Sequence, residues 1–188
     1  MSRRTHRTRL AYLLAVALGS SCSRLVECDG PPFSFDPRAP YRLILGWGSG
    51  MDGLETFDLQ ANGALQLVRR LVHRQSYSWE EAAAVLTPQQ IAAVGELVVG
   101  HGVAGYRRLY EDPDLRDGEQ WVLCLEQGGR RRVVYCNNHF PPGIREFRDA
   151  LLAAVEAEQL LWSPQKDLGQ REHDVHLWQV EREEPIVR

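Results

Sequence analysis

The sequence predicts an α+β domain in which two helices pack on one face of an antiparallel sheet of about five strands. Strand-like segments gather around two turn signals, which predicts two β-hairpins. An amphipathic helical pattern follows each hairpin. Because a single sheet face can bury the apolar stripes of both helices, we expect the two helices to share that face. The chain is 44% apolar and 25% charged, so it can bury such a core.

The first group of strands lies between residues 41 and 72. Residues 41–47 have the composition of a strand and lead into a glycine-rich loop at residues 48–53. Residues 54–60 and 64–72 are separated by Asn62-Gly63, a dipeptide that favours the two-residue turns of β-hairpins. We therefore expect three strands here. Residues 79–85 fit either a short helix or a strand extension.

The first helix has a complete start signal. A threonine before a proline, with glutamine three positions after the threonine, predicts an N-cap, a proline in the first turn and a capping box. Apolar residues then recur at helical spacing, and glycines end the pattern. The residues concerned are Thr87, Pro88, Gln90, Ile91, Val94, Val98, Gly100 and Gly102.

A second hairpin and a second helix follow. Residues 121–126 and 131–136 are expected to pair around Gly128-Gly129. Pro141-Pro142 opens a segment whose apolar residues lie at helical spacing, namely Ile144, Phe147, Leu151 and Val155. From residue 160 the chain becomes polar, and residues 175–180 fit one late strand.

Residues 1–21 have the pattern of a bacterial signal peptide. Residues 2–9 are basic, residues 10–18 are apolar, and three small residues precede Cys22. Nine apolar residues are too few to span a bilayer but match the apolar region of a signal peptide. Export by the general secretory route fits better than twin-arginine export, because His6 and Arg7 stand where the latter signal is apolar.

Residues 18–22, Leu-Gly-Ser-Ser-Cys, resemble the lipobox of bacterial lipoproteins. The resemblance implies lipid attachment at Cys22 and anchoring in the periplasm or at the outer membrane. The sequence departs from the family pattern, because Leu18 stands one position early and Gly19 occupies its usual place. The alternative is ordinary cleavage near Gly19 or Ser21, which would secrete a soluble protein.

The predicted organisation has four parts. A signal peptide at residues 1–21 is followed by a Pro/Gly-rich tether at residues 22–40, which carries four prolines. The α+β domain occupies residues 41–160, and residues 161–188 form a polar tail. Removing residues 1–21 takes four arginines and no acid, which changes the formal charge from −3 to −7. An acidic mature chain excludes nucleic acid as an expected partner.

Two motifs that suggest ligand binding lack their required context. Residues 48–53 match G-x-G-x-x-G, but a strand pattern follows where dinucleotide binding needs a helix. Ser49 is not a nucleophile elbow, because Trp47 replaces the glycine of that motif. Residues 112–118 resemble a calcium loop, yet Arg116 and Asp117 occupy positions of a ligand and of the required glycine.

The histidines and cysteines predict neither a metal site nor a disulfide. His173 and His176 are three residues apart, unlike the zincin spacing of four. Pairing Gln127 with Arg130 puts Cys124 and Cys136 on opposite faces of the second hairpin, although a longer turn would bring them together. We therefore expect no cofactor, and we expect unpaired thiols at Cys124 and Cys136; the pairing of Cys28 stays open.

Three functions follow from these patterns. The first is a non-catalytic envelope lipoprotein with a binding or structural domain. The second is a protein-binding inhibitor, because the order of elements from residue 41 to 155 and the glycine-bearing first hairpin resemble emfourin-like inhibitors of bacterial metalloproteases. Such a module would expose Trp47 and Met51. The third is an enzyme, for which the loop residues to inspect are His101, Tyr110, Asp112, Asp114 and His139, the last in the sequence Cys-Asn-Asn-His.

Overall fold

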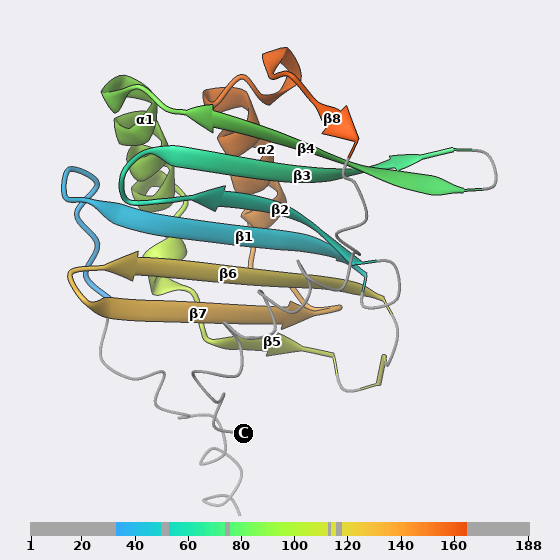
Figure 1. The fold of residues 1–188 in the computed structure, drawn as a ribbon. Coiled ribbons are helices and arrows are strands. Elements are labelled where there is room, and N and C mark those ends of the chain that lie inside the picture. The colour runs from blue at the N-terminus through green and yellow to red at the C-terminus, as the bar shows by residue number, and fades with distance from the viewer. Residues whose placement is uncertain (1–32, 50–52, 74–75, 113, 116–117, 165–188) are drawn as a thin grey trace, which may run out of the picture. The chain divides into compact units, whose positions relative to one another are not determined.

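A computed structural model describes residues 33–49, 53–73, 76–112, 114–115 and 118–164. These residues form an eight-stranded sheet with two helices, in the spatial order β5-β7-β6-β1-β2-β3-β4-β8. Figure 1 shows both helices on the same face of the sheet. The predicted α+β class and the shared helix face are therefore confirmed.

The central strands follow the predicted hairpins. The strands β1 (Tyr41–Ser49), β2 (Gly53–Leu59) and β3 (Ala64–Val72) form an antiparallel meander. The strands β6 (Glu119–Gln127) and β7 (Arg130–Asn137) form the second hairpin, and β6 pairs with β1. The two groups thus join into one sheet through β1.

The expected number of strands, about five, was wrong. Three strands were not assigned: β4 (Tyr77–Val85), β5 (Leu109–Glu111) and β8 (Ser163–Pro164). β4 contains residues 79–85, so the strand alternative is correct for that segment. The sheet is also mixed, because β5 runs parallel to β7 at one edge. The two edge strands β5 and β8 have three and two residues, too few to show an alternating pattern.

Both helices begin where the sequence indicated. The helix α1 (Pro88–Gly100) has Thr87 as N-cap, and the reciprocal hydrogen bonds of the capping box between Thr87 and Gln90 are present. The helix α2 (Ile144–Ala154) follows Gly143, whose φ of 81° lies in the left-handed region that glycine adopts without strain. Short 3-10 turns, η1 (Val103–Gly105) and η2 (Ala157–Gln159), follow the two helices.

The main core lies between the helices and the sheet. Val94 and Val98 of α1 and Phe147 and Leu151 of α2 are completely buried against alternate residues of the central strands. Residues before β1 also contribute, because Phe33 is buried in the same core. None of the helices in the described residues is long and apolar enough to cross a membrane.

A second apolar cluster lies on the opposite, helix-free face of the sheet. We call it the helix-free cluster; it consists of Ile44, Leu54, Val122, Cys124 and Val133, with Tyr135 packed against it. All of its members are strand residues, and the buried residues of α1 and α2 belong to the main core. The sheet therefore has an apolar centre on both faces.

Candidate functional site

The β3–β4 hairpin extends beyond the rest of the sheet. β2 pairs with β3 only from Thr56 opposite Val68 to Leu59 opposite Leu65. The pairing of β3 with β4 continues for four more residue pairs, as far as Val72 opposite Tyr77. Figure 1 shows these ends of β3 and β4 projecting past the neighbouring strands. Residues 69–72 and 77–80 are thus a two-stranded projection.

One face of this projection carries aromatic, apolar and basic side chains. We call Arg70, Val72, Tyr77 and Trp79 the hairpin tip; strand alternation and register put all four on one face. Val72 is 75% exposed and Tyr77 is 45% exposed. The ring centroids of Tyr77 and Trp79 are 6.3 Å apart in an edge-on arrangement. The guanidinium carbon of Arg70 lies 5.8 Å from the Tyr77 centroid.

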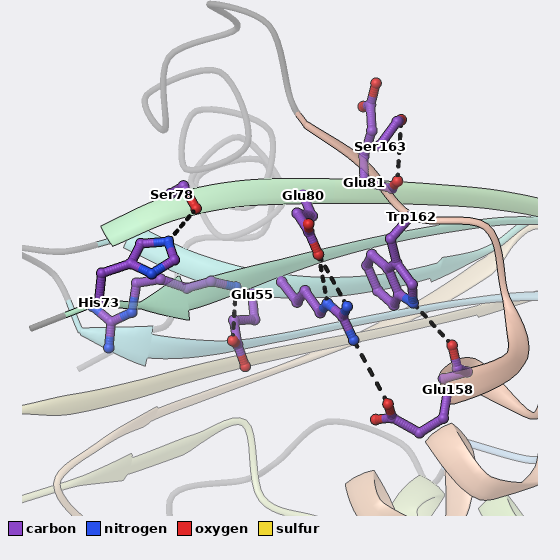
Figure 2. Close-up of polar contacts among 11 residues, drawn as sticks. Glu55, His73, Ser78, Glu80, Glu81, Glu158, Trp162 and Ser163 are labelled. Atoms are coloured by element: carbon purple, nitrogen blue, oxygen red, sulfur yellow. Dashed lines mark hydrogen bonds and ion pairs between the residues drawn. The ribbon is translucent and has the colours of Figure 1, made fainter. Parts of the chain in front are cut away.

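The opposite face of the projection is held by an ion-pair and aromatic cluster (Figure 2). Arg69 Nε and Nη2 both donate to Glu80 Oε2, at 3.1 and 3.0 Å. The guanidinium carbon of Arg69 also lies 4.0 Å from the centroid of the Trp162 ring. Trp162 Nε1 in turn donates to the carbonyl of Ala157 at 3.0 Å. These contacts connect β3 and β4 to the segment that follows α2.

The base and the end of the projection are also held by side chains. Glu55 Oε1 accepts a hydrogen bond from the Arg70 backbone amide at 2.9 Å, and its Oε2 accepts one from Trp47 Nε1 at 2.5 Å. At the far end, the His73 amide donates to the Ser76 carbonyl at 2.7 Å. The His73 ring lies 3.1 Å from Ser78 Oγ (Figure 2). Hydrogen bonds therefore hold the projection both at its base and at its far end.

This arrangement suits the binding of another protein. Tyrosine, tryptophan and arginine are the residue types that contribute most often to protein interfaces. A two-stranded projection presents them away from the bulk of the sheet. The Arg69–Glu80–Trp162 cluster on the opposite face holds the backbone of β3 and β4 that carries them.

The polar residues selected for an enzyme do not form one site. Tyr110 and His139 stack with ring centroids 5.9 Å apart, and the Tyr110 hydroxyl accepts a hydrogen bond from the Arg107 amide. His101 instead contacts the ring of Phe147 in the core. Asp112 accepts a hydrogen bond from the amide of Asp114, as in an aspartate turn. These five residues thus serve separate local structures.

The glycine-rich segment connects two strands. Ser49 at the end of β1 pairs with Gly53 at the start of β2, so no helix N-terminus follows the motif. A Cβ atom at Gly48 would lie 2.2 Å from the Gly53 carbonyl oxygen, which explains why this position needs glycine. The interpretation of residues 48–53 as a turn rather than a dinucleotide site agrees with this pairing. Met51 lies outside the described residues.

The two hairpin cysteines are separate buried thiols, as the register predicted. Cys124 lies opposite Val133 and Cys136 lies opposite Trp121. Burial raises the pKa of the Cys136 thiol to about 12. Burial also raises the pKa of Cys124 to about 11, although the hydrogen bond from Arg131 Nε, at 3.4 Å from Sγ, opposes this shift. Neither thiol is activated as a nucleophile.

The described residues contain no group of three or more histidine, cysteine or acidic side chains that could hold a metal ion. His173, His176, Arg116 and Asp117 lie outside those residues, as do Cys22 and Cys28. Arg131 and Glu126 form a cross-strand ion pair at the end of the second hairpin, with Arg131 Nε 3.4 Å from the carboxylate of Glu126.

The exposure of Trp47 that we expected of an inhibitor-like module was wrong. Only 8% of Trp47 is exposed, because its ring packs against Trp121 at 6.2 Å and the Arg148 guanidinium lies 5.8 Å from it. Among the exposed large apolar residues, Val72 and Tyr77 lie together on the hairpin tip, and sequence reasoning did not select them. The Tyr-Ser-Trp sequence of residues 77–79 was the available signal, but the segment lacked a strong turn dipeptide.

Fold and site together define an α+β protein with a projecting hairpin that presents an apolar and aromatic surface. No protein-family model matches the chain. No curated protein matches it either.

Proposed function

We propose that this protein is a cell-envelope lipoprotein, exported by its signal peptide and anchored through Cys22, whose domain binds a partner protein through the hairpin tip. The projection of Val72 and Tyr77 beyond the sheet supports the binding role most directly. The basic and apolar pattern of residues 2–21, followed by Cys22, supports export and anchoring. Of the tether expected at residues 22–40, only residues 22–32 would separate the domain from the membrane, because Phe33 is already buried in the core of the domain.

The chemistry of the hairpin tip indicates what its partner offers. Val72 and Tyr77 together fit an apolar pocket. Arg70 lies beside them, with its guanidinium carbon 5.8 Å from the Tyr77 centroid, and adds a basic group to this surface. An extracytoplasmic protease has a cleft that such a hairpin could enter, so the inhibitor alternative is a specific form of the same proposal.

Site-specific photo-crosslinking in producing cells tests this proposal. A photoreactive phenylalanine analogue replaces Val72 in one variant and Val85 in a matched control. Val85 belongs to β4 and is 80% exposed, but it pairs with Ala64 at the other end of the hairpin. We expect a discrete crosslinked protein from position 72 only, and we expect Tyr77→Ala to reduce its yield.

Crosslinks of equal yield from positions 72 and 85, or none from position 72, would contradict the binding role. If position 72 captures a protease, a measurement of that protease's activity with the purified domain distinguishes inhibition from simple binding. The inhibitor alternative requires that Tyr77→Ala weakens the inhibition together with the crosslink.

A further inference from the structure

The helix-free cluster is buried although no described helix lies over it. Cys124 and Val133 have no exposed surface, Ile44 is 1% exposed, and Val122 and Leu54 are 3% and 6% exposed. Among the described residues, the cluster consists of strand residues alone, and α1 and α2 pack on the other face. Arg131 and Glu126 contact Cys124 from this face, with Arg131 Nε 3.4 Å and Glu126 Oε1 3.7 Å from its Sγ. Neighbouring strands shield the other members from the sides, but they do not cover them from above.

The burial indicates a cover supplied by the same chain. The cluster is already buried in a single protomer, so a second copy of the chain is not needed to bury it. Two segments of the chain lie outside the described residues and are long enough, residues 1–32 and residues 165–188. Of these, residues 1–21 would be removed with the signal peptide, which leaves residues 22–32 and 165–188 as candidates.

The composition of the two segments favours residues 165–188 as the cover. Between residues 22 and 32 the larger apolar side chains are Leu25 and Val26. Residues 175–180 read Val-His-Leu-Trp-Gln-Val and supply four large apolar side chains within six positions. An apolar surface of five buried side chains needs a partner of comparable apolar area.

The chain after β8 is long enough to reach the helix-free cluster. Pro164 lies opposite Glu80 at the β4 edge, and β6 is five strands further across the sheet. With strands about 4.8 Å apart, this distance is roughly 24 Å. The ten residues from 165 to 174 span about 33 Å when extended. Residues 175–180 can therefore reach the helix-free cluster.

We propose that residues 175–180 lie across the helix-free face and cover the cluster of Ile44, Leu54, Val122, Cys124 and Val133. The segment completes the fold as a second layer opposite the helices. The exclusion of residues 1–21 rests on the proposed signal peptide. The inference otherwise does not depend on the hairpin tip or on lipid attachment at Cys22, so it can fail without affecting either.

The two cysteines provide a test in the full-length chain. With Cys22→Ser and Cys28→Ser as background, only Cys124 under the proposed cover and Cys136 in the main core can react with N-ethylmaleimide. One variant adds Leu177→Asp and Trp178→Asp, and its control adds the same charge at polar positions, Gln170→Asp and His173→Asp. Mass spectrometry of the peptides measures the labelling rate of each thiol.

We expect the Leu177/Trp178 variant to label at Cys124 at least about tenfold faster than the background, because access to a buried thiol limits its reaction. Labelling at Cys136 should not change, which also shows that the main core is intact. The control variant should behave like the background. Unchanged labelling of Cys124 would overturn the proposal.

A chain that ends at Pro164 gives a second measurement. Faster labelling of Cys124 with Cys136 still protected supports the proposal. Protection of both thiols in that shortened chain overturns it. Deletion of residues 23–32 distinguishes the other candidate, because exposure of Cys124 by that deletion alone would assign the cover to the tether and refute the assignment made here. If the shortened chain unfolds and both thiols react, the full-length variants decide.

Discussion

Glu55 accepts a hydrogen bond from the backbone amide of Arg70 at 2.9 Å, at the position where β3 leaves its pairing with β2. The carboxylate takes the place of a strand-to-strand hydrogen bond and holds the base of the projecting hairpin. Its second oxygen holds the indole of Trp47. One side chain of β2 thus connects β1 with β3.

Replacing Glu55 with alanine should destabilise the domain. The change removes two acceptors and leaves the Arg70 amide and the Trp47 indole without their partner, so we expect a loss of about 1–3 kcal/mol in the free energy of unfolding. Urea denaturation measures this loss. Glu158→Ala is the control, because Glu158 is 93% exposed and its ion pair with Arg69 spans 3.7 Å, so its removal should have little effect. Equal losses in both variants would contradict this role of Glu55.

Two glycines of α1 should respond oppositely to alanine. A Cβ atom at Gly95 would lie 2.9 Å from the Pro37 carbonyl oxygen and equally close to its Cβ atom, so Gly95→Ala should displace residues 33–40 and lower the melting temperature. Nothing lies within 4 Å of a Cβ atom at Gly100. Gly100→Ala should therefore be neutral, or should stabilise the helix by up to about 1 kcal/mol. Thermal melts of both variants measure the difference, and similar shifts would argue against the contact with Pro37.

The buried thiols should make the domain less stable in alkali. The pKa values of Cys124 and Cys136 are raised by burial to about 11 and about 12, from an ordinary value of 9.0. The unfolded chain therefore loses these protons first, so the stabilising effect is complete below pH 9 and is lost as the pH rises toward 11. Each thiol should contribute a slope of up to about 1.4 kcal/mol per pH unit in that window.

Urea denaturation between pH 7 and 10.5 tests this expectation. The double variant Cys124→Ala and Cys136→Ala should be less stable at pH 7, because it loses packing in both clusters. Its stability should nevertheless fall less steeply above pH 9 than that of the unmodified chain. Parallel curves for the two proteins would show that the thiols do not cause the alkaline loss.

Lipid attachment at Cys22 predicts a simple labelling result. When the chain is produced in a bacterium with radioactive palmitate, the protein should become labelled and remain with the membrane fraction. Cys22→Ala should abolish both properties, whereas Cys28→Ala should not. A Cys22→Ala variant that still incorporates palmitate would refute lipid attachment at this residue. Export would be unaffected by that result, because it depends on residues 2–21.

Local sequence signals predicted the local structure well. The Thr87–Gln90 capping box formed as predicted, and the turn at Gly128-Gly129 set the register that separates Cys124 from Cys136. Both features depend on residues a few positions apart, so their geometry is encoded in a short stretch of chain.

Features that depend on distant pairing were not predictable in the same way. β4 has small alanines at residues 82–84, so its sequence shows little alternation, and it is a strand because it pairs along all of β3. β5 and β8 are too short to carry a pattern and exist only because an edge of the sheet is available to them. Strand propensity is weak beside such long-range contacts.

By itself, the sequence determined the α+β class, the caps, the turns and the hairpin register of this protein, because each depends on neighbouring residues. Only the tertiary structure decided which aromatic side chains are buried. Trp47 lies under Arg148 and against Trp121, which come from other parts of the chain. Tyr77 is exposed because β3 and β4 continue beyond the end of their pairing with β2. Whether a side chain is buried depends on the layers that pack around it, so a short segment of sequence cannot determine it.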